Sequence, residues 1–429
     1  MHDEPEFRAL LEVLRKVDTA YAHFEMNLLE KGDGYPGRAY ALSALRAEPA
    51  VARDLKWAGV DIVSCAYNHA LDWGIPGVLG TMTHLDAAGV VHAGIGSNLE
   101  EASEPAYFES PAGRVALVSL ATGHHPYDSA SPTKSPVRGR PGVNPPRITQ
   151  KHRIDRETLE VMKAAWSKLG MSTAPRWWMN LADGDVCFSV GDHGGGDSYS
   201  FIFTPGDKPE IVSEFNEQDL ARNMRAIADA RRQADLVLVA HHAAVNDGHR
   251  GEDPAKMVPP LAKMCIDAGA DVFIGHGWHR QLGIELYNNC PIIYGTGNFF
   301  AQSPFLQRFP ADTYEGQGSD MSQLTTLTPA DLHDRRDHNI GHHHKAQPWG
   351  VVPSMKFAGG KVREIELHPY TLGGEVDCLR PRTTGSRMDG RPVMANREEA
   401  NFIISEVRRL SAKFGTEIGS KEGVGTIRC

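Results

Sequence analysis

The sequence lacks the features that mark several protein classes. It has no apolar stretch of membrane-spanning length, and residues 1–20 lack the charged start, apolar middle and small-residue cleavage site of a signal peptide. Its six cysteines are scattered without a CxxC pair, which argues against a zinc ribbon or a small disulfide framework. Basic residues are not in excess, because the chain has 45 Lys and Arg and 54 Asp and Glu, which gives a net charge of −9. This balance argues against a sequence-independent nucleic-acid binder. We expect a cytoplasmic protein without a membrane anchor.

What the chain does have is an ordinary globular composition, with 41% hydrophobic and 23% charged residues, in which strand-like and helix-like segments alternate. The expected helices cover residues 4–16, 49–57, 74–88, 155–169, 217–234 and 255–268. The expected strands cover residues 19–24, 60–64, 90–93, 114–120, 235–240, 271–274, 282–286 and 291–294. This alternation predicts an α/β fold with parallel strands, whose active groups usually lie beyond the carboxyl ends of the strands.

Two stretches break the alternation. Residues 121–150 contain six prolines, too many for the interior of a helix or strand, and predict a long loop. Residues 302–348 turn polar and contain the triplet His342 to His344, which indicates an insertion. Beyond it, residues 351–367 alternate as in a β-hairpin, with glycines 359 and 360 at the turn, and a final helix is expected over about 397–414.

The 20 histidines turn attention to metal binding and acid/base chemistry, because imidazole serves both. Polar residues gather at three strand ends. The first is the segment 64–72, where Asn68, His69 and Asp72 follow a strand and precede a helix. An Asn oxygen can bind a cation, and a neighbouring His can donate a proton to a leaving group. Taken alone, a turn at Asn68 and a helix cap at Asp72 are about equally well supported.

The second strand end carries His241 and His242, of which only one faces a site if the strand is regular. The third carries His276 and His279, three residues apart, with flanking glycines that let the backbone fold tightly. Structural histidines would explain the second pair alone. Three such ends along one sheet edge nevertheless favour a polynuclear metal site over coincidence.

These motifs resemble a known family. Residues 61–94, with YNHALDWG, and residues 234–299, with HH, GHGWH, GIELY and PIIYGTGNF, are similar to the CapA family of capsule (poly-γ-glutamate) synthesis proteins, which resembles the calcineurin-like metallophosphoesterases. The resemblance implies a four-layer α/β/β/α metallo-dependent phosphatase-like sandwich with loop insertions. We expect this domain over residues 1–370, with insertions at about 121–215 and 302–346. Residues 371–429 would form a C-terminal extension whose helix packs on the core.

The family's NNHxxD motif falls on the first strand end. The resemblance implies that Asn68 is a metal ligand, that His69 protonates the leaving group and that Asp72 orients His69. These roles fit the chemistry of the three side chains.

Further metal ligands are implied by the remaining motifs. The strand-end histidine of the family matches His242, and its GHxxH motif falls on His276 and His279. Its NLE motif falls on residues 23–25, which implies Glu25 as a ligand and places His23 where the family has Asn. Family chains open with a strand ending in Gly-Asp, whose Asp binds metal, and no residue here replaces that Asp by position. A strand would point His23 and Glu25 to one face, so we expect His23 to supply a ligand.

The expected function is metal-dependent hydrolysis of an amide, γ-glutamyl bonds among them, or a phosphoester, by a metal-activated water. One or two divalent ions, Zn²⁺, Mn²⁺ or Fe²⁺, suit the mixed N and O ligands. The expected partner is a small-molecule or polyanionic substrate, with Asn298, Arg140 and Arg147 as substrate-binding residues, although a solvated loop explains the arginines slightly better. A homo-oligomer is permitted. The alternative is a non-catalytic or weakly metal-binding factor in poly-γ-glutamate capsule synthesis.

Overall fold

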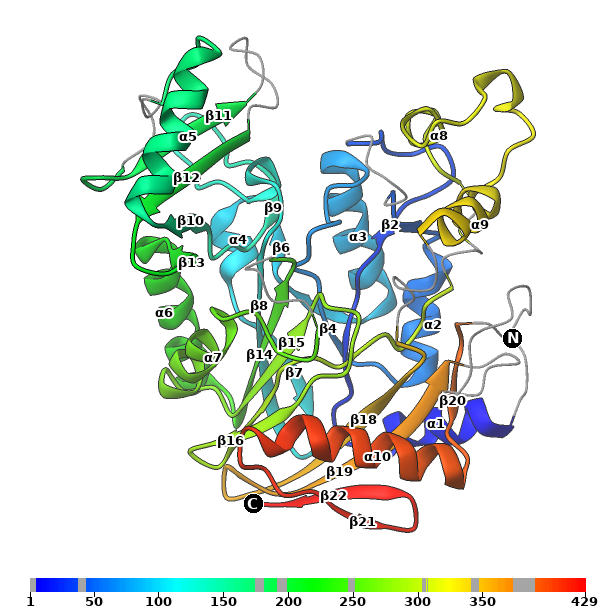
Figure 1. Ribbon diagram of the computed structural model, residues 1–429. Coiled ribbons are helices and arrows are strands. Elements are labelled where there is room, and N and C mark those ends of the chain that lie inside the picture. Colours follow the sequence, from blue (N-terminus) through cyan, green and yellow to red (C-terminus); the bar gives the residue numbers. More distant parts are fainter. Residues whose placement is uncertain are drawn as a thin grey trace.

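The computed structural model describes residues 5–37, 44–173, 181–190, 199–245, 251–302, 306, 308–340, 347–372 and 390–429. Two sheets carry the strand ends singled out in the sequence (Figure 1). The larger sheet has the order β16-β17-β15-β14-β8-β7, with β8, β14, β15 and β17 parallel and antiparallel strands at both edges. Its strands are β7 (Ala106–Ser110), β8 (Gly113–Thr122), β14 (Leu236–Ala243), β15 (Val272–His276), β16 (Ile284–Tyr287) and β17 (Cys290–Ile293).

The smaller sheet has three parallel strands in the order β1-β4-β5. They are β1 (Tyr21–His23), β4 (Ile62–Ser64) and β5 (Val91–Ala93). One apolar cluster joins the two sheets, with Ile62 of β4 packed among Leu117 of β8 and Ile274 of β15. Burial of this cluster holds the strands of both sheets side by side.

Helices pack against both sheets. A cluster around Val63 and Leu85 joins the smaller sheet to α2 (Ala50–Ala58) and α3 (Gly74–Ala88). A cluster around Val239 and Leu261 joins the larger sheet to α6 (Glu217–Gln233) and α7 (Val258–Asp267). The helix expected over 74–88 is confirmed to the residue, because Gly89 adopts φ 69° and its left-handed backbone ends the helix.

The C-terminal part confirms the expected hairpin and final helix. Strands β18 (Trp349–Ala358) and β19 (Lys361–Leu372) are joined by the two glycines, and a sheet is completed by β20 (Pro392–Met394), β21 (Gly419–Lys421) and β22 (Val424–Arg428). Helix α10 (Arg397–Ala412) begins with a capping box at Asn396. Its Ile403 and Val407 pack with Ile284 and Ile365. The boundary expected at residue 370 stays a prediction.

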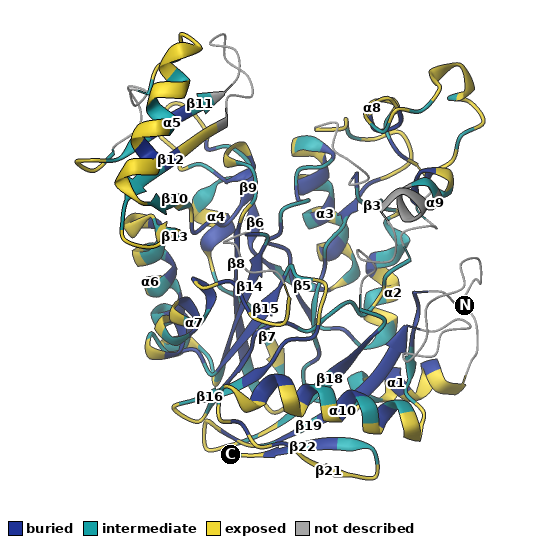
Figure 2. Ribbon diagram, in the orientation of Figure 1, coloured by how far each residue is buried: buried dark blue, intermediate teal, exposed yellow. Residues whose placement is uncertain are grey.

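The insertions contain more regular structure than the sequence predicts. Within 121–215 the strands β10 (Ile148–Ile154), β11 (Val186–Val190), β12 (Tyr199–Pro205) and β13 (Glu210–Phe215) form a sheet with α5 (Arg156–Lys168) beside it. Helices α8 (Ala311–Gly316) and α9 (Pro329–Ile340) lie in the second insertion. Figures 1 and 2 show both insertions extending from the body, with α5 exposed along much of its length. The triplet His342 to His344 lies outside the described residues.

The remaining elements are short, apart from the first helix. They are α1 (Pro5–Arg15), α4 (Leu99–Ser103), the two-stranded pair β2 (Asn27–Leu28) with β3 (Arg46–Ala47), the pair β6 (Ile95–Gly96) with β9 (Gly142–Val143), and 3-10 turns at Pro126–Asp128 and Met321–Gln323. The loop expected over 121–150 therefore contains β9, which pairs with β6. Among the described residues, no helix combines the length and the apolar character needed to cross a bilayer.

Candidate metal centre

The centre lies where the carboxyl ends of strands from both sheets meet. His23 ends β1 in register with Ser64 of β4, and His242 near the end of β14 is in register with His276, the last residue of β15. The rings of His23 and His276 stack at 4.3 Å between centroids with 12° between their planes. His23 and His276, far apart in the chain, thus meet at one edge, as parallel strands with aligned carboxyl ends allow.

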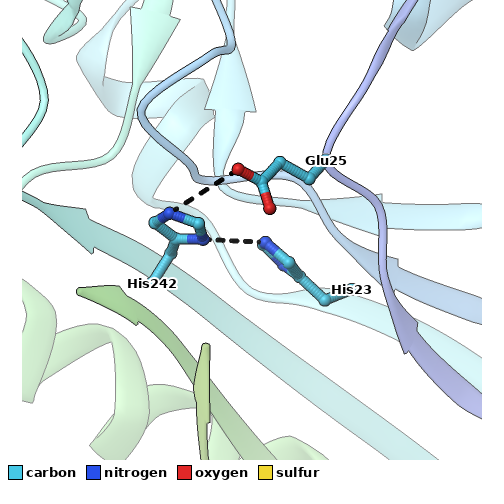
Figure 3. Close-up of side chains that lie close together, drawn as sticks. All are labelled: His23, Glu25 and His242. Carbon is cyan, nitrogen blue, oxygen red and sulfur yellow. Dashed lines mark hydrogen bonds and ion pairs between the residues drawn. The ribbon is translucent and has the colours of Figure 1, made fainter. Parts of the chain in front are cut away.

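His23, Glu25 and His242 form the heart of the centre. One ligand atom from each lies within 4.8 Å of the other two. Figure 3 shows the three side chains pointing toward one another. The Nε2 atom of His23 is 2.9 Å from Nδ1 of His242, and its Nδ1 is 2.8 Å from Oγ of Ser64. The expectation that His23 and Glu25 share a face is consistent with this cluster.

The carboxylate of Glu25 lies close to two imidazole nitrogens but beyond hydrogen-bond distance of both. Its Oε1 lies 3.9 Å from Nε2 of His242 and 4.0 Å from Nε2 of His69. Both separations are too long for a hydrogen bond. Two ligands of one ion, each about 2.0–2.2 Å from it, lie at most about 4.4 Å apart. The spacing therefore fits a cation between the carboxylate and an imidazole.

A buried oxygen adds to this fit. Oδ1 of Asn68 is shielded from solvent and has no hydrogen-bond partner. Leaving a buried polar atom without a partner costs about 1–3 kcal/mol, and a cation would satisfy an amide oxygen. The donor set of imidazole nitrogen, carboxylate and amide oxygen suits Zn²⁺, Mn²⁺ or Fe²⁺.

His69 and Asp72 form the pair that the sequence predicts. Nδ1 of His69 is 3.0 Å from Oδ2 of Asp72, and the same oxygen accepts the backbone N–H of Leu45 at 2.9 Å. The carboxylate thus orients the ring so that Nε2 faces Glu25. This is the arrangement of a general acid held by a carboxylate.

His276 and His279 lie on the third strand end. Nε2 of His276 is 2.7 Å from the hydroxyl of Tyr21, and its Nδ1 is 3.1 Å from Oγ1 of Thr296. Nδ1 of His279 is 2.8 Å from Oδ1 of Asn298. His279 adopts φ 54°, a left-handed backbone that is uncommon outside glycine and asparagine.

Burial keeps the central imidazoles neutral. It lowers the pKa of His23 to about 3, with a smaller contribution from the charge of His279. Burial and then the neighbouring imidazoles lower the pKa of His242 and of His276 well below the ordinary value. A neutral imidazole is the form that binds a metal ion, so the centre is electrostatically prepared for one.

Comparison with known proteins identifies the family of the chain. The sequence model of the family described as bacterial capsule synthesis protein PGA_cap matches residues 2–303. The chain belongs to this family. Two proteins of Sinorhizobium fredii, y4sH and y4uA, are each 30% identical to it over 436 aligned residues, covering 99% of this chain and 88% of the relative. The PGA biosynthesis protein CapA of Bacillus subtilis is 33% identical over 109 residues, 25% of this chain and 28% of that protein. The resemblance to CapA proteins is confirmed.

Three residues of this PGA_cap protein escaped the sequence reasoning. The hydroxyl of Tyr21 lies 2.7 Å from both Oγ of Ser64 and Nε2 of His276, and Thr296 contacts the other nitrogen of that ring. Tyr21 lies two residues before His23 and Thr296 two residues before Asn298, and these short separations from predicted site residues were the available signal. Ser64 gave a weaker one, because it precedes the Asn-His motif by four residues.

The predicted substrate-binding arginines are held by other groups. Arg147 donates from Nε and Nη2 to the buried carboxylate of Asp219, at 2.6 and 2.9 Å. Arg140 donates to the carbonyl oxygen of Ser129. His241 is buried with Nε2 3.0 Å from a threonine hydroxyl, as expected for the structural member of the pair. The substrate-binding roles of Arg140, Arg147 and Asn298 stay predictions.

Proposed function

We propose that this PGA_cap protein is a metal-dependent hydrolase acting on an amide, γ-glutamyl bonds among them, or on a phosphoester bond of a small molecule or polymer. The observation that carries the proposal is the position of Glu25. Its Oε1 lies 3.9 Å from Nε2 of His242 and 4.0 Å from Nε2 of His69, without a hydrogen bond to either. The separation from His242 favours a cation shared by this carboxylate and imidazole, and the separation from His69 leaves room between that ring and Glu25 for a substrate group.

The fold we propose is the four-layer α/β/β/α sandwich of metallo-dependent phosphatases. Three apolar clusters support it: one between the sheets around Ile62, one between the smaller sheet and α3 around Leu85, and one between the larger sheet and α7 around Leu261. In such a sandwich the strand ends of both sheets can contribute ligands to one centre.

Glu25, Asn68, His242 and His23 would hold one ion, and His276 and His279 would hold a second where two are bound. A divalent cation there supplies a Lewis acid and lowers the pKa of a bound water. His69 donates a proton to the leaving group from Nε2, while Asp72 accepts the Nδ1–H and fixes the ring.

The substrate we propose is anionic, a γ-glutamyl compound or a phosphoester, and not a nucleic acid, because the chain carries a net charge of −9. Arg140 donates to Ser129 and Arg147 to Asp219. To bind a carboxylate or phosphate group of the substrate, each arginine would have to give up this hydrogen bond or donate to both groups at once. Association into a homo-oligomer is compatible with this proposal.

Elemental analysis of the purified protein, followed by hydrolysis assays with and without chelator, tests the proposal. We expect stoichiometric metal, and chelator-sensitive cleavage of p-nitrophenyl phosphate or of a γ-glutamyl anilide. His242→Ala should lose both metal and activity, and His23→Ala should lower metal occupancy. His84→Ala, at a half-buried helical position of α3, is the matched control. Metal-free wild-type protein that hydrolyses neither substrate after metal is added would overturn the proposal.

The second candidate is an accessory factor in capsule polymer synthesis without catalysis. It is favoured by the name of the Bacillus subtilis relative, which is a PGA biosynthesis protein. This candidate predicts that alanine at His242 or His276 leaves capsule-related function intact. Loss of that function in a folded His276→Ala variant would exclude it.

A further inference from the structure

The segment Thr296-Gly297-Asn298, which follows β17, contacts both histidines of the GHxxH motif. Oγ1 of Thr296 is 3.1 Å from Nδ1 of His276, and Oδ1 of Asn298 is 2.8 Å from Nδ1 of His279. Two neighbouring side chains of one short segment thus engage the same ring position, Nδ1, of two predicted ligands. A substrate-binding role for Asn298 would not explain why Thr296 and Asn298 contact the same ring nitrogen of the two histidines.

The contact between Asn298 and His279 fixes which atom is the hydrogen-bond donor. An amide oxygen can only accept a hydrogen bond, so Nδ1 of His279 must carry the proton. In a neutral imidazole Nε2 then carries the lone pair. That is the tautomer in which Nε2 can bind a metal ion, and a hydrogen bond from the other ring nitrogen also raises the basicity of the ligand.

The segment is itself firmly held. The hydroxyl of Tyr370, a buried residue of β19, donates to the carbonyl oxygen of Asn298 at 2.7 Å. The N–H of Gly297 donates to the carbonyl oxygen of Arg280 at 3.1 Å, and Gly297 adopts φ 71°. These contacts fix Asn298 from two sides. They also offset the cost of the left-handed backbone at His279, which an unsupported loop would relax.

We propose that Asn298 is a positioning residue that holds His279 in the Nδ1–H tautomer, which leaves the lone pair on Nε2 for a metal ion. This inference rests on the proposed function for its purpose, since the tautomer matters only if His279 binds metal. The contact itself exists in the metal-free protein and can be tested there.

The first test measures the tautomer. In metal-free protein with ¹⁵N-labelled histidine, the imidazole signals of His279, assigned by their loss in His279→Ala, should show the proton on Nδ1. In Asn298→Leu, which has similar volume and no acceptor, this preference should be lost. In Asn298→Asp, which keeps the acceptor, it should be retained. A proton on Nε2 in the wild-type protein would overturn the inference.

The second test measures affinity for Zn²⁺ or Mn²⁺ by calorimetric titration. We expect Asn298→Leu to bind about 10–100-fold more weakly and Asn298→Asp to stay within a few-fold of wild type. Thr122→Val is the matched control, because it removes a hydroxyl from His241, a buried histidine outside the centre. Wild-type affinity in Asn298→Leu would overturn the inference and leave the proposed function intact. A wild-type protein that binds no metal would overturn the proposed function instead, while the tautomer measurement would still decide the contact.

Discussion

Neutralising Glu25 should abolish most of the stabilisation that a bound cation confers. Glu25 is the carboxylate of the His23, Glu25 and His242 group, and the imidazoles beside it are neutral through burial. Two unit charges about 4 Å apart interact by about 4 kcal/mol at an effective dielectric constant of about 20, and a divalent ion bound directly to the carboxylate would interact more strongly. A 100-fold loss of affinity in Glu25→Gln, about 2.7 kcal/mol, is therefore a modest expectation.

The assay is unfolding by urea with and without metal. At a free metal concentration of about 100 times the wild-type Kd, the wild-type protein should gain about 2.7 kcal/mol, and Glu25→Gln only about 0.4 kcal/mol. Glu30→Gln is the matched control, since the side chain of Glu30 is exposed and the residue contacts Arg46 through its carbonyl oxygen. Equal metal-dependent stabilisation in Glu25→Gln and wild type would refute the assignment of Glu25 as a ligand.

Three further predictions concern other parts of the molecule. Asp72→Asn should lower kcat about 100-fold and leave the metal affinity unchanged, because Asp72 holds His69 and not the ligand group. Hydrolysis kinetics and metal titration of the same preparation measure the two quantities. The buried carboxylate of Asp219 has a lowered pKa through Arg147, so its stabilisation is complete above pH of about 4 and should fall as the pH drops below it. Asp219→Asn should flatten that part of the pH–stability curve in urea titrations. Burial raises the pKa of the Cys65 thiol, so a thiol reagent should modify it only as fast as the protein unfolds.

Local patterns were sufficient to predict most of the body. Helix α3 matches the expected range because its apolar residues recur with helical spacing and a left-handed Gly89 follows it. The hairpin of β18 and β19 was equally predictable, since its two glycines at φ 60° and 70° are required by the turn. Strand ends with His or Asn side chains could likewise be recognised, because parallel strands of an α/β fold present them on one edge.

The partners across the centre could not be predicted from the residues alone. His23 contacts His242, 219 residues away, and Tyr21 contacts His276, 255 residues away. Nothing in a local pattern specifies which strands of two sheets come together. The sheet of β10 to β13 was missed because neither β10 nor β13 has a fully buried face, which leaves no regular alternation of apolar and polar residues in the sequence.

The electrostatics of the centre bear on the proposed action of an acidic protein on an anionic substrate. The imidazoles of His23 and His242 beside Glu25 are neutral, so the group of these three residues carries one negative charge when Glu25 is ionised. A divalent cation in this cluster leaves a local charge of about +1, and charge at a partly buried position is screened much less than charge on the surface. The net charge of −9 is spread over the whole chain, whereas the positive charge lies at the strand ends. Under the proposed function, a carboxylate or phosphate group would therefore be attracted to the loaded centre and only weakly to the metal-free one, which would make substrate binding depend on metal occupancy.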